Sequence, residues 1–263
     1  MSADHLNSEV STGRKRAGAA LHTVDLTAGY GGRPVVHGVS ISVEPGRVVS
    51  IVGPNGSGKS TMLKSIVGVV KVLSGSVLLD DVDITNQAPE DTARVGVGYV
   101  PQVDDVFGPL SVKENLEMGG YLLPSRQVPD RIDRVLTYFP RLATMLTRRA
   151  AQLSGGERKM LAMGRVLMTQ PALYVLDEPT ANLAPAIALE LLHEHVRALA
   201  VDGASVLIVE QRAKAVLGIS DYTYVLAGGR LRMQGSPTEL ASSPDFVDSF
   251  LGGGHGNTRF GSP

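Results

Sequence analysis

The sequence lacks cysteine and long apolar runs. With no cysteine among its 263 residues, the chain cannot form disulfide bonds, thiolate metal sites or a cysteine nucleophile, which fits a reducing compartment. No window approaches the roughly 18 consecutive apolar residues of a membrane-spanning helix, so any membrane role is expected to be peripheral. Residues 1–20 also lack an apolar stretch long enough for a signal peptide, and we therefore expect no export.

An excess of charge of one sign is missing too. Lys and Arg number 25 against 26 for Asp and Glu, so the net charge of −1 favours neither nucleic acid nor an anionic bilayer as a partner. The basic residues 14–16 are interpreted as part of a solvated tail rather than a targeting or nucleic-acid patch. Hydrophobic residues make up 43% of the chain, enough for a substantial core in one large domain or two small ones.

Secondary-structure signals divide the chain into a β-rich start, a helical middle and an alternating end. Residues 21–52 are typical of strands joined by tight turns, and residues 48–84 indicate a strand, a Gly-rich loop, an amphipathic helix and a strand, which is a βαβ-like beginning. Residues 111–169 have helical periodicity. Strand and helix signals then alternate over residues 172–212, as expected of a parallel sheet. The tails, residues 1–20 and 252–263, are expected to be disordered.

The segment "GPNGSGKS", residues 53–60, matches the phosphate-binding loop pattern, after an apolar strand and before a helix. Its glycines let backbone N–H groups point at phosphate oxygens, and the helix presents its N-terminus to the same anion. Lys59 adds a positive charge, and the Ser60 hydroxyl is suited to Mg²⁺. The alternative is a Gly-rich turn before a helix, which leaves the spacing of Lys59 and Ser60 unexplained.

A second motif is "LYVLDEP", residues 173–179, a buried strand that ends in two carboxylates. It places Asp177 and Glu178 at the carboxyl edge of a parallel sheet, where α/β proteins bind ligands. Asp177 is expected to hold Mg²⁺, while Glu178 is expected to face the other way and to polarise the water that attacks the γ-phosphate. A kinase or a small GTPase would carry both motifs as well.

The segment "LSGGERKM", residues 153–160, separates these classes. Ser154 before two glycines at a helix start forms a second anion site, which alone would be an ordinary helix cap. Together with the two other motifs, it closely resembles the signature of ATP-binding cassette (ABC) ATPases, over about residues 21–251. A small-molecule kinase would leave this segment unexplained.

The resemblance implies an α/β fold: a P-loop NTPase core with a RecA-like parallel sheet, an antiparallel β subdomain and an inserted α-helical subdomain at about residues 103–165. It implies ATP and Mg²⁺ as ligands. The residues expected to bind ATP are Tyr30, whose ring would stack on adenine, and Gly53, Pro54, Asn55, Gly56, Ser57, Gly58, Lys59, Ser60 and Thr61. The residues expected to contact the ATP of a partner subunit are Ser154, Gly155, Gly156 and Glu157.

Further family positions are found one by one. Gln102, in "YVPQ", resembles the glutamine that touches Mg²⁺ or the attacking water, so the resemblance implies Ser60, Gln102 and Asp177 around the metal. Many relatives have an aspartate at or beside Leu183, and this chain has none there. Gln211 stands where most members have a histidine; its amide can donate to a phosphate oxygen but cannot become cationic near neutral pH. Beside it, Glu210 has no assigned role.

"YGG", "ENLEMGGY", "FPRL", "LAP" and "VEQ" resemble the smaller ATPase subunit of branched-chain amino acid importers, with importers of urea and short amides as the alternative. Residues 102–109 depart from the amino acid group. The resemblance implies two membrane permease subunits, a second ABC ATPase in a heterodimer or a homodimer, and an extracytoplasmic substrate-binding protein. It places the chain peripherally at the cytoplasmic face of the membrane. A non-transport ABC ATPase acting on ribosomes or DNA is disfavoured by the single cassette and the neutral charge.

Overall fold

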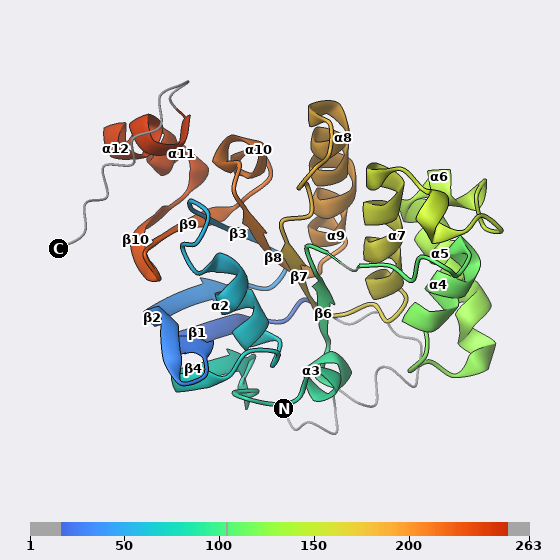
Figure 1. Cartoon of the computed structure of the whole chain (residues 1–263), viewed down its shortest axis with the longest axis horizontal. Helices are drawn as coiled ribbons and strands as arrows, with labels where there is room; N and C mark the ends of the chain where they lie inside the picture. Colours follow the sequence, from blue (N-terminus) through green and yellow to red (C-terminus); the bar gives the residue numbers. More distant parts are fainter. Residues whose placement is uncertain (1–16, 104, 252–263) are drawn as a thin grey trace.

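The computed structural model describes residues 17–103 and 105–251, which form two sheets and a group of helices (Figure 1). The smaller sheet is antiparallel, with the strand order β2-β1-β4-β5, and the larger has the order β10-β9-β3-β8-β7-β6. The smaller sheet contains β1 (Leu21–Tyr30), β2 (Arg33–Val43), β4 (Val72–Leu79) and β5 (Val82–Asp83). The larger contains β3 (Val48–Val52), β6 (Val97–Val100), β7 (Leu173–Asp177), β8 (Ser205–Glu210), β9 (Tyr222–Ala227) and β10 (Arg230–Gly235).

The larger sheet is parallel except for β10, which runs antiparallel to β9. Its central strands β3, β7 and β8 are buried along their whole length, as parallel strands covered on both faces usually are. Because β8 lies between β3 and β7, the residues that follow these three strands meet at one edge of the sheet. The sheet order therefore brings three distant segments of the sequence together.

The helices surround the larger sheet (Figure 1). A group of them lies between β6 and β7 in the chain: α4 (Val112–Gly119), α5 (Val128–Tyr138), α6 (Pro140–Ala143) and α7 (Gly155–Leu167). The others are α2 (Lys59–Ile66), α3 (Pro89–Val95), α8 (Pro185–Glu190), α9 (Arg197–Val201), α10 (Ala213–Leu217), α11 (Pro237–Ala241) and α12 (Pro244–Phe246). Short turns of other helix types complete them: η1 (Ser125–Gln127), η2 (Ala150–Gln152), η3 (Leu191–Val196) and η4 (Val247–Leu251).

Alternate residues of the central strands enter two different hydrophobic clusters. On β3, Val48 and Val52 join the cluster formed with the helical group, whereas Val49 and Ile51 join the one formed with α2 and the antiparallel sheet. This alternation follows from the two-residue period of a strand. The larger sheet is thus the middle layer, and its position is set by burial on both faces.

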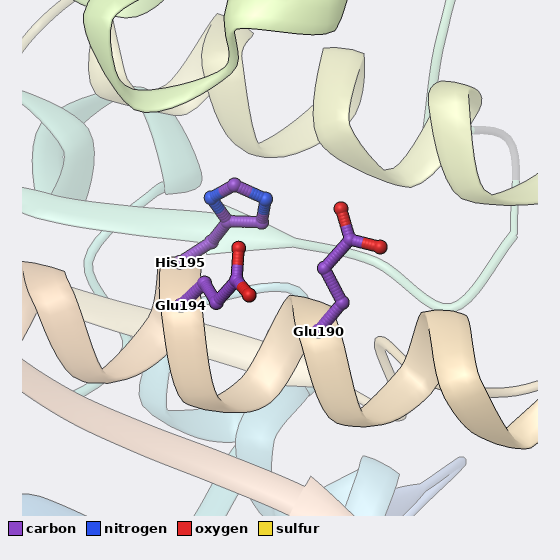
Figure 2. A group of neighbouring side chains, drawn as sticks. All are labelled: Glu190, Glu194 and His195. Carbon is purple, nitrogen blue, oxygen red and sulfur yellow. The ribbon is translucent and has the colours of Figure 1, made fainter.

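A π-helical turn, η3, joins α8 to α9 and carries side chains toward the helical group. Figure 2 shows Glu190, Glu194 and His195 on the same side of this helix. Glu190 forms an ion pair of 3.2 Å with Arg141 of α6, and burial lowers the pKa of the His195 imidazole, against the opposing charges of Glu190 and Glu194. Since Glu190 already pairs with a cation, this group is best described as a polar contact between α8 and the helical group.

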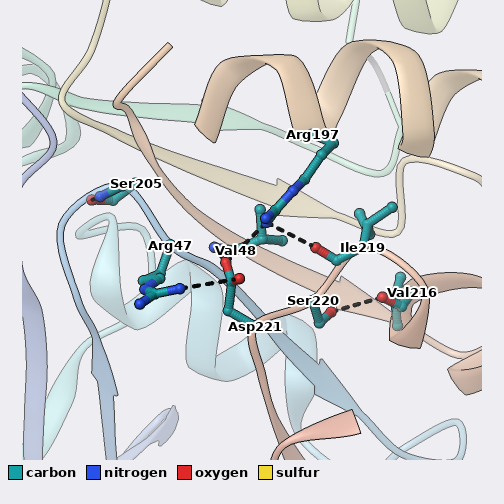
Figure 3. Close-up of polar contacts among 9 residues, drawn as sticks. Arg47, Val48, Arg197, Ser205, Val216, Ile219, Ser220 and Asp221 are labelled. Carbon is teal, nitrogen blue, oxygen red and sulfur yellow. Dashed lines mark hydrogen bonds and ion pairs between the residues drawn. The ribbon is translucent and has the colours of Figure 1, made fainter. Parts of the chain in front are cut away.

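Asp221 joins the larger sheet to α9 (Figure 3). Its Oδ2 accepts a 2.8 Å hydrogen bond from the backbone N–H of Val48 and a 3.0 Å bond from Arg197, and its Oδ1 accepts a 3.4 Å bond from Arg47. Burial opposes ionisation, but these hydrogen bonds and charges lower the pKa of the Asp221 carboxyl overall. The carboxylate therefore fixes the start of β3, the strand that leads into the phosphate-binding loop.

Two expectations from the sequence are wrong. The strand after α2 does not return to β3: β4 pairs with β1, so residues 48–84 are not a βαβ unit but a crossing from one sheet to the other. The disordered N-terminal tail was also expected to extend too far, to residue 20. Ala19 is buried, and its backbone carbonyl accepts a 2.7 Å hydrogen bond from Ser205. The remaining tail positions, 1–16 with the basic residues 14–16, and 252–263, lie outside the described residues.

Candidate active site

The loop of residues 53–60 curls around the Lys59 side chain between β3 and α2. Lys59 Nζ donates hydrogen bonds of 2.9 Å to the Gly53 carbonyl and 3.0 Å to the Pro54 carbonyl. Gly53 has no room for a side chain, because a Cβ would lie 2.1 Å from the Leu226 carbonyl oxygen. Gly56 and Gly58 have φ of 76° and 96°, the left-handed region that favours glycine. The motif residues thus build the loop, and burial lowers the pKa of the Lys59 ammonium, against the carboxylates of Glu178 and Asp177.

The two carboxylates at the end of β7 both reach this loop: Asp177 is the last residue of the strand, and Glu178 follows it. Asp177, which is buried, accepts hydrogen bonds of 2.9 Å from Ser60 Oγ and 3.3 Å from the Tyr99 hydroxyl. Glu178 lies 3.9 Å from Lys59 Nζ through Oε1. Glu178 follows the end of the strand with φ of 45°, so the direction of its side chain relative to Asp177 is set by this turn and not by strand alternation.

Gln102 completes this group from the segment after β6. Its side-chain Nε2 donates a 2.9 Å hydrogen bond to Glu178 Oε2. Lys159, a buried residue of α7, donates 2.8 Å and 3.3 Å hydrogen bonds to the carbonyls of Gln102 and Pro101 and forms a 2.7 Å ion pair with Asp105. The burial of Lys159 was not predictable from the sequence, since nothing in "ERKM" separates a buried lysine from a solvated one.

A cavity of about 560 Å³ lies over these groups at the carboxyl edge of the sheet. Gln211 lines it, next to Glu210, which is 2% exposed and accepts two hydrogen bonds from Thr180. The lining residues come from the loop, from Gln102 and from the ends of β7 and β8: Val35, Asn55, Gly56, Ser57, Gly58, Lys59, Ser60, Thr61, Gln102, Glu178, Thr180, Ala181, Asn182, Glu210, Gln211 and Arg212. The structure therefore gathers most of the expected nucleotide-site residues in one place.

The signature residues lie elsewhere. Ser154 is the N-cap of α7 and forms a capping box with Glu157, whose carboxylate accepts a 2.8 Å hydrogen bond from the Ser154 N–H; this bond lowers the pKa of Glu157. Gly155 packs against the loop after β7 and Gly156 against α8: a Cβ at these positions would lie 3.3 Å from Leu183 Cδ2 and 2.6 Å from Ile187 Cγ2, respectively. None of the four expected signature residues lines the cavity over the phosphate-binding loop.

Two further positions answer questions raised by the sequence. Leu183, the position at or beside which the family resemblance implies an aspartate, is buried and packs against Gly155 of the signature. Tyr30 lies at the end of β1 and is 54% exposed. Tyr30 is not among the cavity-lining residues.

Comparison with known proteins agrees with this geometry. The family model "ABC transporter" matches residues 36–181. The chain is 41% identical over 233 residues to the probable branched-chain amino acid transport ATP-binding protein LivF of Archaeoglobus fulgidus, covering 88% of this chain and 98% of that protein. It is 38% identical over 224 residues to the high-affinity branched-chain amino acid transport ATP-binding protein BraG of Pseudomonas aeruginosa, covering 85% and 96% of the two chains.

The chain is also similar, at lower identity, to a protein of another transport process and to a solved structure. The lipopolysaccharide export system ATP-binding protein LptB of Escherichia coli K12 is 33% identical over 239 residues, covering 89% of this chain and 98% of that protein. The crystal structure of the ADP conformation of an ATP-binding cassette of an ABC transporter superposes with a TM-score of 0.79 and 32% identity, covering 88% of this chain and 97% of that one.

Fold and site together define an ATP-binding cassette, a P-loop NTPase core with an antiparallel β subdomain and a helical subdomain. The chain belongs to the ABC transporter family: it is an ATP-binding subunit, an ATPase that acts with the membrane components of a transporter. Within residues 17–103 and 105–251, none of the helices has both the length and the apolar character that crossing a bilayer requires.

Proposed function

We propose that residues 53–61 bind the phosphates of ATP and that Glu178 is the general base for hydrolysis. The observation that carries this proposal is the meeting of Lys59, Gln102 and Glu178 over one cavity, with Glu178 held by both neighbours. Lys59 and the loop N–H groups bind phosphate oxygens, and Glu178 accepts a proton from the attacking water. Gln102 orients Glu178, and Gln211 donates its amide to a phosphate oxygen.

Ser60 and Asp177 are the proposed magnesium ligands, with Gln102 beside them. The Ser60 hydroxyl is hydrogen-bonded to the buried Asp177 carboxylate. A hydroxyl and a carboxylate side by side are oxygen ligands that Mg²⁺ takes in phosphate sites. When bound, Mg²⁺ neutralises charge on the terminal phosphates. The protein groups hold the position: Tyr99 donates to the second oxygen of Asp177 and orients its carboxylate.

The signature residues are proposed to serve a second cassette subunit. Two observations support this role: Ser154, Gly155 and Gly156 do not line the cavity of their own chain, and they form the N-terminus of α7, a kind of position that binds anions. ATP between the two subunits would join them, and hydrolysis would release the contact. The partner is a different ATPase in a heterodimer, or a second copy of this chain.

The proposed membrane partner is a pair of permease subunits that dock between the core and the helical group. A cavity of about 410 Å³ is lined there by residues of α4 and α7 and by the segments around α3 and β6. Val69, Met118, Tyr121 and Leu122 around it are exposed large apolar side chains. Exposed apolar residues gathered over one groove mark a protein interface, which agrees with a peripheral place at the cytoplasmic face of the membrane.

The proposed transport process is uptake of branched-chain or related amino acids, supplied by an extracytoplasmic binding protein. The LivF and BraG relatives support this substrate class. Uptake of urea or short amides is the alternative, and the LptB relative shows that similar chains also serve export. An ATPase subunit does not touch the cargo, so the partners decide between these processes.

One experiment tests the assignment of partners. The chain with Glu178→Gln, which is expected to hold ATP without hydrolysing it, is isolated from its native membranes and the accompanying proteins are identified by mass spectrometry. We expect to recover two multi-span permeases and a second cassette protein. The extracytoplasmic binding protein of the same system can then be tested for binding of leucine, valine, urea and acetamide. Recovery of the chain alone or with ribosomes would contradict the transport assignment.

A further inference from the structure

Glu210 is a buried carboxylate at the centre of the carboxyl edge of the larger sheet. It ends β8, where it pairs with Val52 of β3, and the preceding Val209 pairs with Asp177 of β7. Its side chain is 2% exposed. A carboxylate so placed loses solvation, and burial raises the pKa of Glu210, with the nearby Glu178 charge acting in the same direction. Such a group needs strong partners to remain there.

Thr180 supplies these partners. Its backbone N–H and its hydroxyl both donate to Oε1 of Glu210, at 2.9 Å and 2.7 Å. Thr180 is itself 1% exposed, so both hydrogen bonds are shielded from water. The pair joins residues 30 positions apart, from the ends of two neighbouring strands.

The segment held by this pair is the turn that begins with Glu178. The N–H of Glu178 donates 3.0 Å to the Val209 carbonyl, and the N–H of Ala181 donates 3.1 Å to the Glu178 carbonyl. Glu178 has φ of 45°, a backbone conformation that a non-glycine residue adopts at a cost and keeps only when its surroundings enforce it. The Glu210–Thr180 hydrogen bonds lie two residues after this position and close the turn from the other side.

We propose that Glu210 is a positioning residue for ATP hydrolysis: by accepting both hydrogen bonds from Thr180, it fixes the turn that aims the Glu178 carboxylate into the cavity. This inference rests on the proposed role of Glu178 as general base. It also explains why an apolar strand ends in Glu210 next to Gln211: both residues line the cavity, but Glu210 is buried and anchors the turn, whereas Gln211 is exposed there.

The test compares two Thr→Val substitutions in the full chain. Thr180→Val removes the hydroxyl donor to Glu210, and Thr223→Val removes an equally buried hydroxyl, whose 2.7 Å bond to Ser50 lies elsewhere in the same sheet. Loss of alignment at a reacting group costs up to about 100-fold in rate. We expect Thr180→Val to lower kcat for ATP hydrolysis about tenfold with KM for ATP unchanged, and Thr223→Val to change only the thermal stability.

Conservative variants keep the test valid if a larger change disturbs folding. Thr180→Ser and Glu210→Gln retain both hydrogen bonds, because a hydroxyl donates and an amide oxygen accepts as before. We expect these two to keep kcat within about threefold, and Glu210→Ala to lower it at least as much as Thr180→Val. If Thr180→Val and Thr223→Val lower stability equally and leave kcat unchanged, or if Glu210→Gln is as slow as Glu210→Ala, the positioning role is wrong.

Failure of the proposed function gives a different result. Hydrolysis by the unmodified chain is measured beside Glu178→Gln. If Glu178→Gln hydrolyses ATP at the unmodified rate, Glu178 is not the base and the premise itself is wrong. If Glu178→Gln is inactive while Thr180→Val and Glu210→Ala are fully active, the premise stands and only the inference on Glu210 fails.

Discussion

Ser60 Oγ donates a 2.9 Å hydrogen bond to Oδ1 of Asp177, joining two residues 117 positions apart in the chain. The contact exists because β3 and β7 both flank β8 and end at the same edge of the sheet. A hydroxyl and a carboxylate are thereby brought to one point beside the phosphate-binding loop. The relationship underlies the proposed magnesium site and can be tested there.

Replacement of Ser60 by Ala is expected to raise the Mg²⁺ concentration needed for half-maximal ATP hydrolysis by about tenfold, because one oxygen ligand is lost. The measurement is a Mg²⁺ titration of hydrolysis at saturating ATP. Ser65→Ala is the control: this serine lies in the same helix, is more deeply buried than the half-buried Ser60, and donates its Oγ hydrogen bond to the Met62 carbonyl rather than to a carboxylate. An unchanged Mg²⁺ requirement in Ser60→Ala would contradict the metal assignment.

Glu178 and Gln211 are expected to differ in their effect on hydrolysis. Glu178→Gln removes the proposed general base, and a positioned base contributes about 10²- to 10⁴-fold in rate. Gln211→Ala removes a neutral donor at the cavity, so we expect a loss of about tenfold only. Steady-state hydrolysis of both variants, with ATP binding measured separately, checks this ranking. A Gln211 variant as inactive as the Glu178 variant would reverse it.

The two signature glycines are expected to tolerate a methyl group differently. In Gly156→Ala the new Cβ would lie 2.6 Å from Ile187 Cγ2 and must displace the Ile187 side chain, whereas in Gly155→Ala it would lie 3.3 Å from Leu183 Cδ2 and needs only a small shift. We expect Gly156→Ala to lower hydrolysis more than Gly155→Ala, with ATP binding unchanged in both. Adding Ile187→Ala to Gly156→Ala should restore part of the activity. No recovery in the double variant would show that packing is not the reason.

Asp221 is expected to stabilise the fold at neutral pH and not in acid. Its pKa is lowered in the folded state, so the stabilisation is present above the unfolded pKa of about 3.9 and is lost as the pH falls through the folded pKa. Asp221→Asn should lower the free energy of unfolding by about 1 to 3 kcal/mol at pH 7, since hydrogen bonds to a charged group are lost. Urea unfolding measures this difference.

The same difference should begin to shrink as the pH falls below the unfolded pKa of Asp221 and should approach zero once the pH is also below its lower folded pKa. Asp91→Asn is the control, since Asp91 pairs with Arg94 at the surface, where ion pairs contribute about 0.2 to 1 kcal/mol at most. A destabilisation by Asp221→Asn that stays constant over the whole pH range would show that shape rather than charge matters at this position.

The nucleotide motifs were predictable because each is contained in a short stretch of sequence. Residues 53–60 form the expected loop between β3 and α2, and Asp177 and Glu178 follow a buried strand as expected. Ser154 caps α7 as its spacing to Glu157 indicates. In these segments the glycine conformations, the helix cap and the apolar run are set by neighbours in the chain, so local chemistry suffices.

Other features depend on partners that no local pattern encodes. The pairing of β4 with β1 instead of β3, the burial of Lys159 beneath Gln102, and the Glu210–Thr180 contact each join segments distant in sequence. The local sequence around a buried lysine or glutamate does not differ from that around a solvated one. The hydrogen-bond partners of such a residue depend on which strands become neighbours in the fold. The sequence therefore shows Glu210 as an unusual polar residue at the end of an apolar strand, but its proposed role could not be predicted.

The sequence by itself determined that this chain binds a nucleotide and belongs among the ABC ATPases, because the loop, the paired carboxylates and the signature are contiguous motifs with their own chemistry. Only the tertiary structure decided how the loop and the paired carboxylates meet and where the signature lies apart from them. The order β3-β8-β7 aligns three strand ends at one edge, and the positive φ of Glu178 turns its carboxylate toward Lys59 and Gln102. Burial of both sheet faces selects this arrangement, and burial is a property of the whole chain.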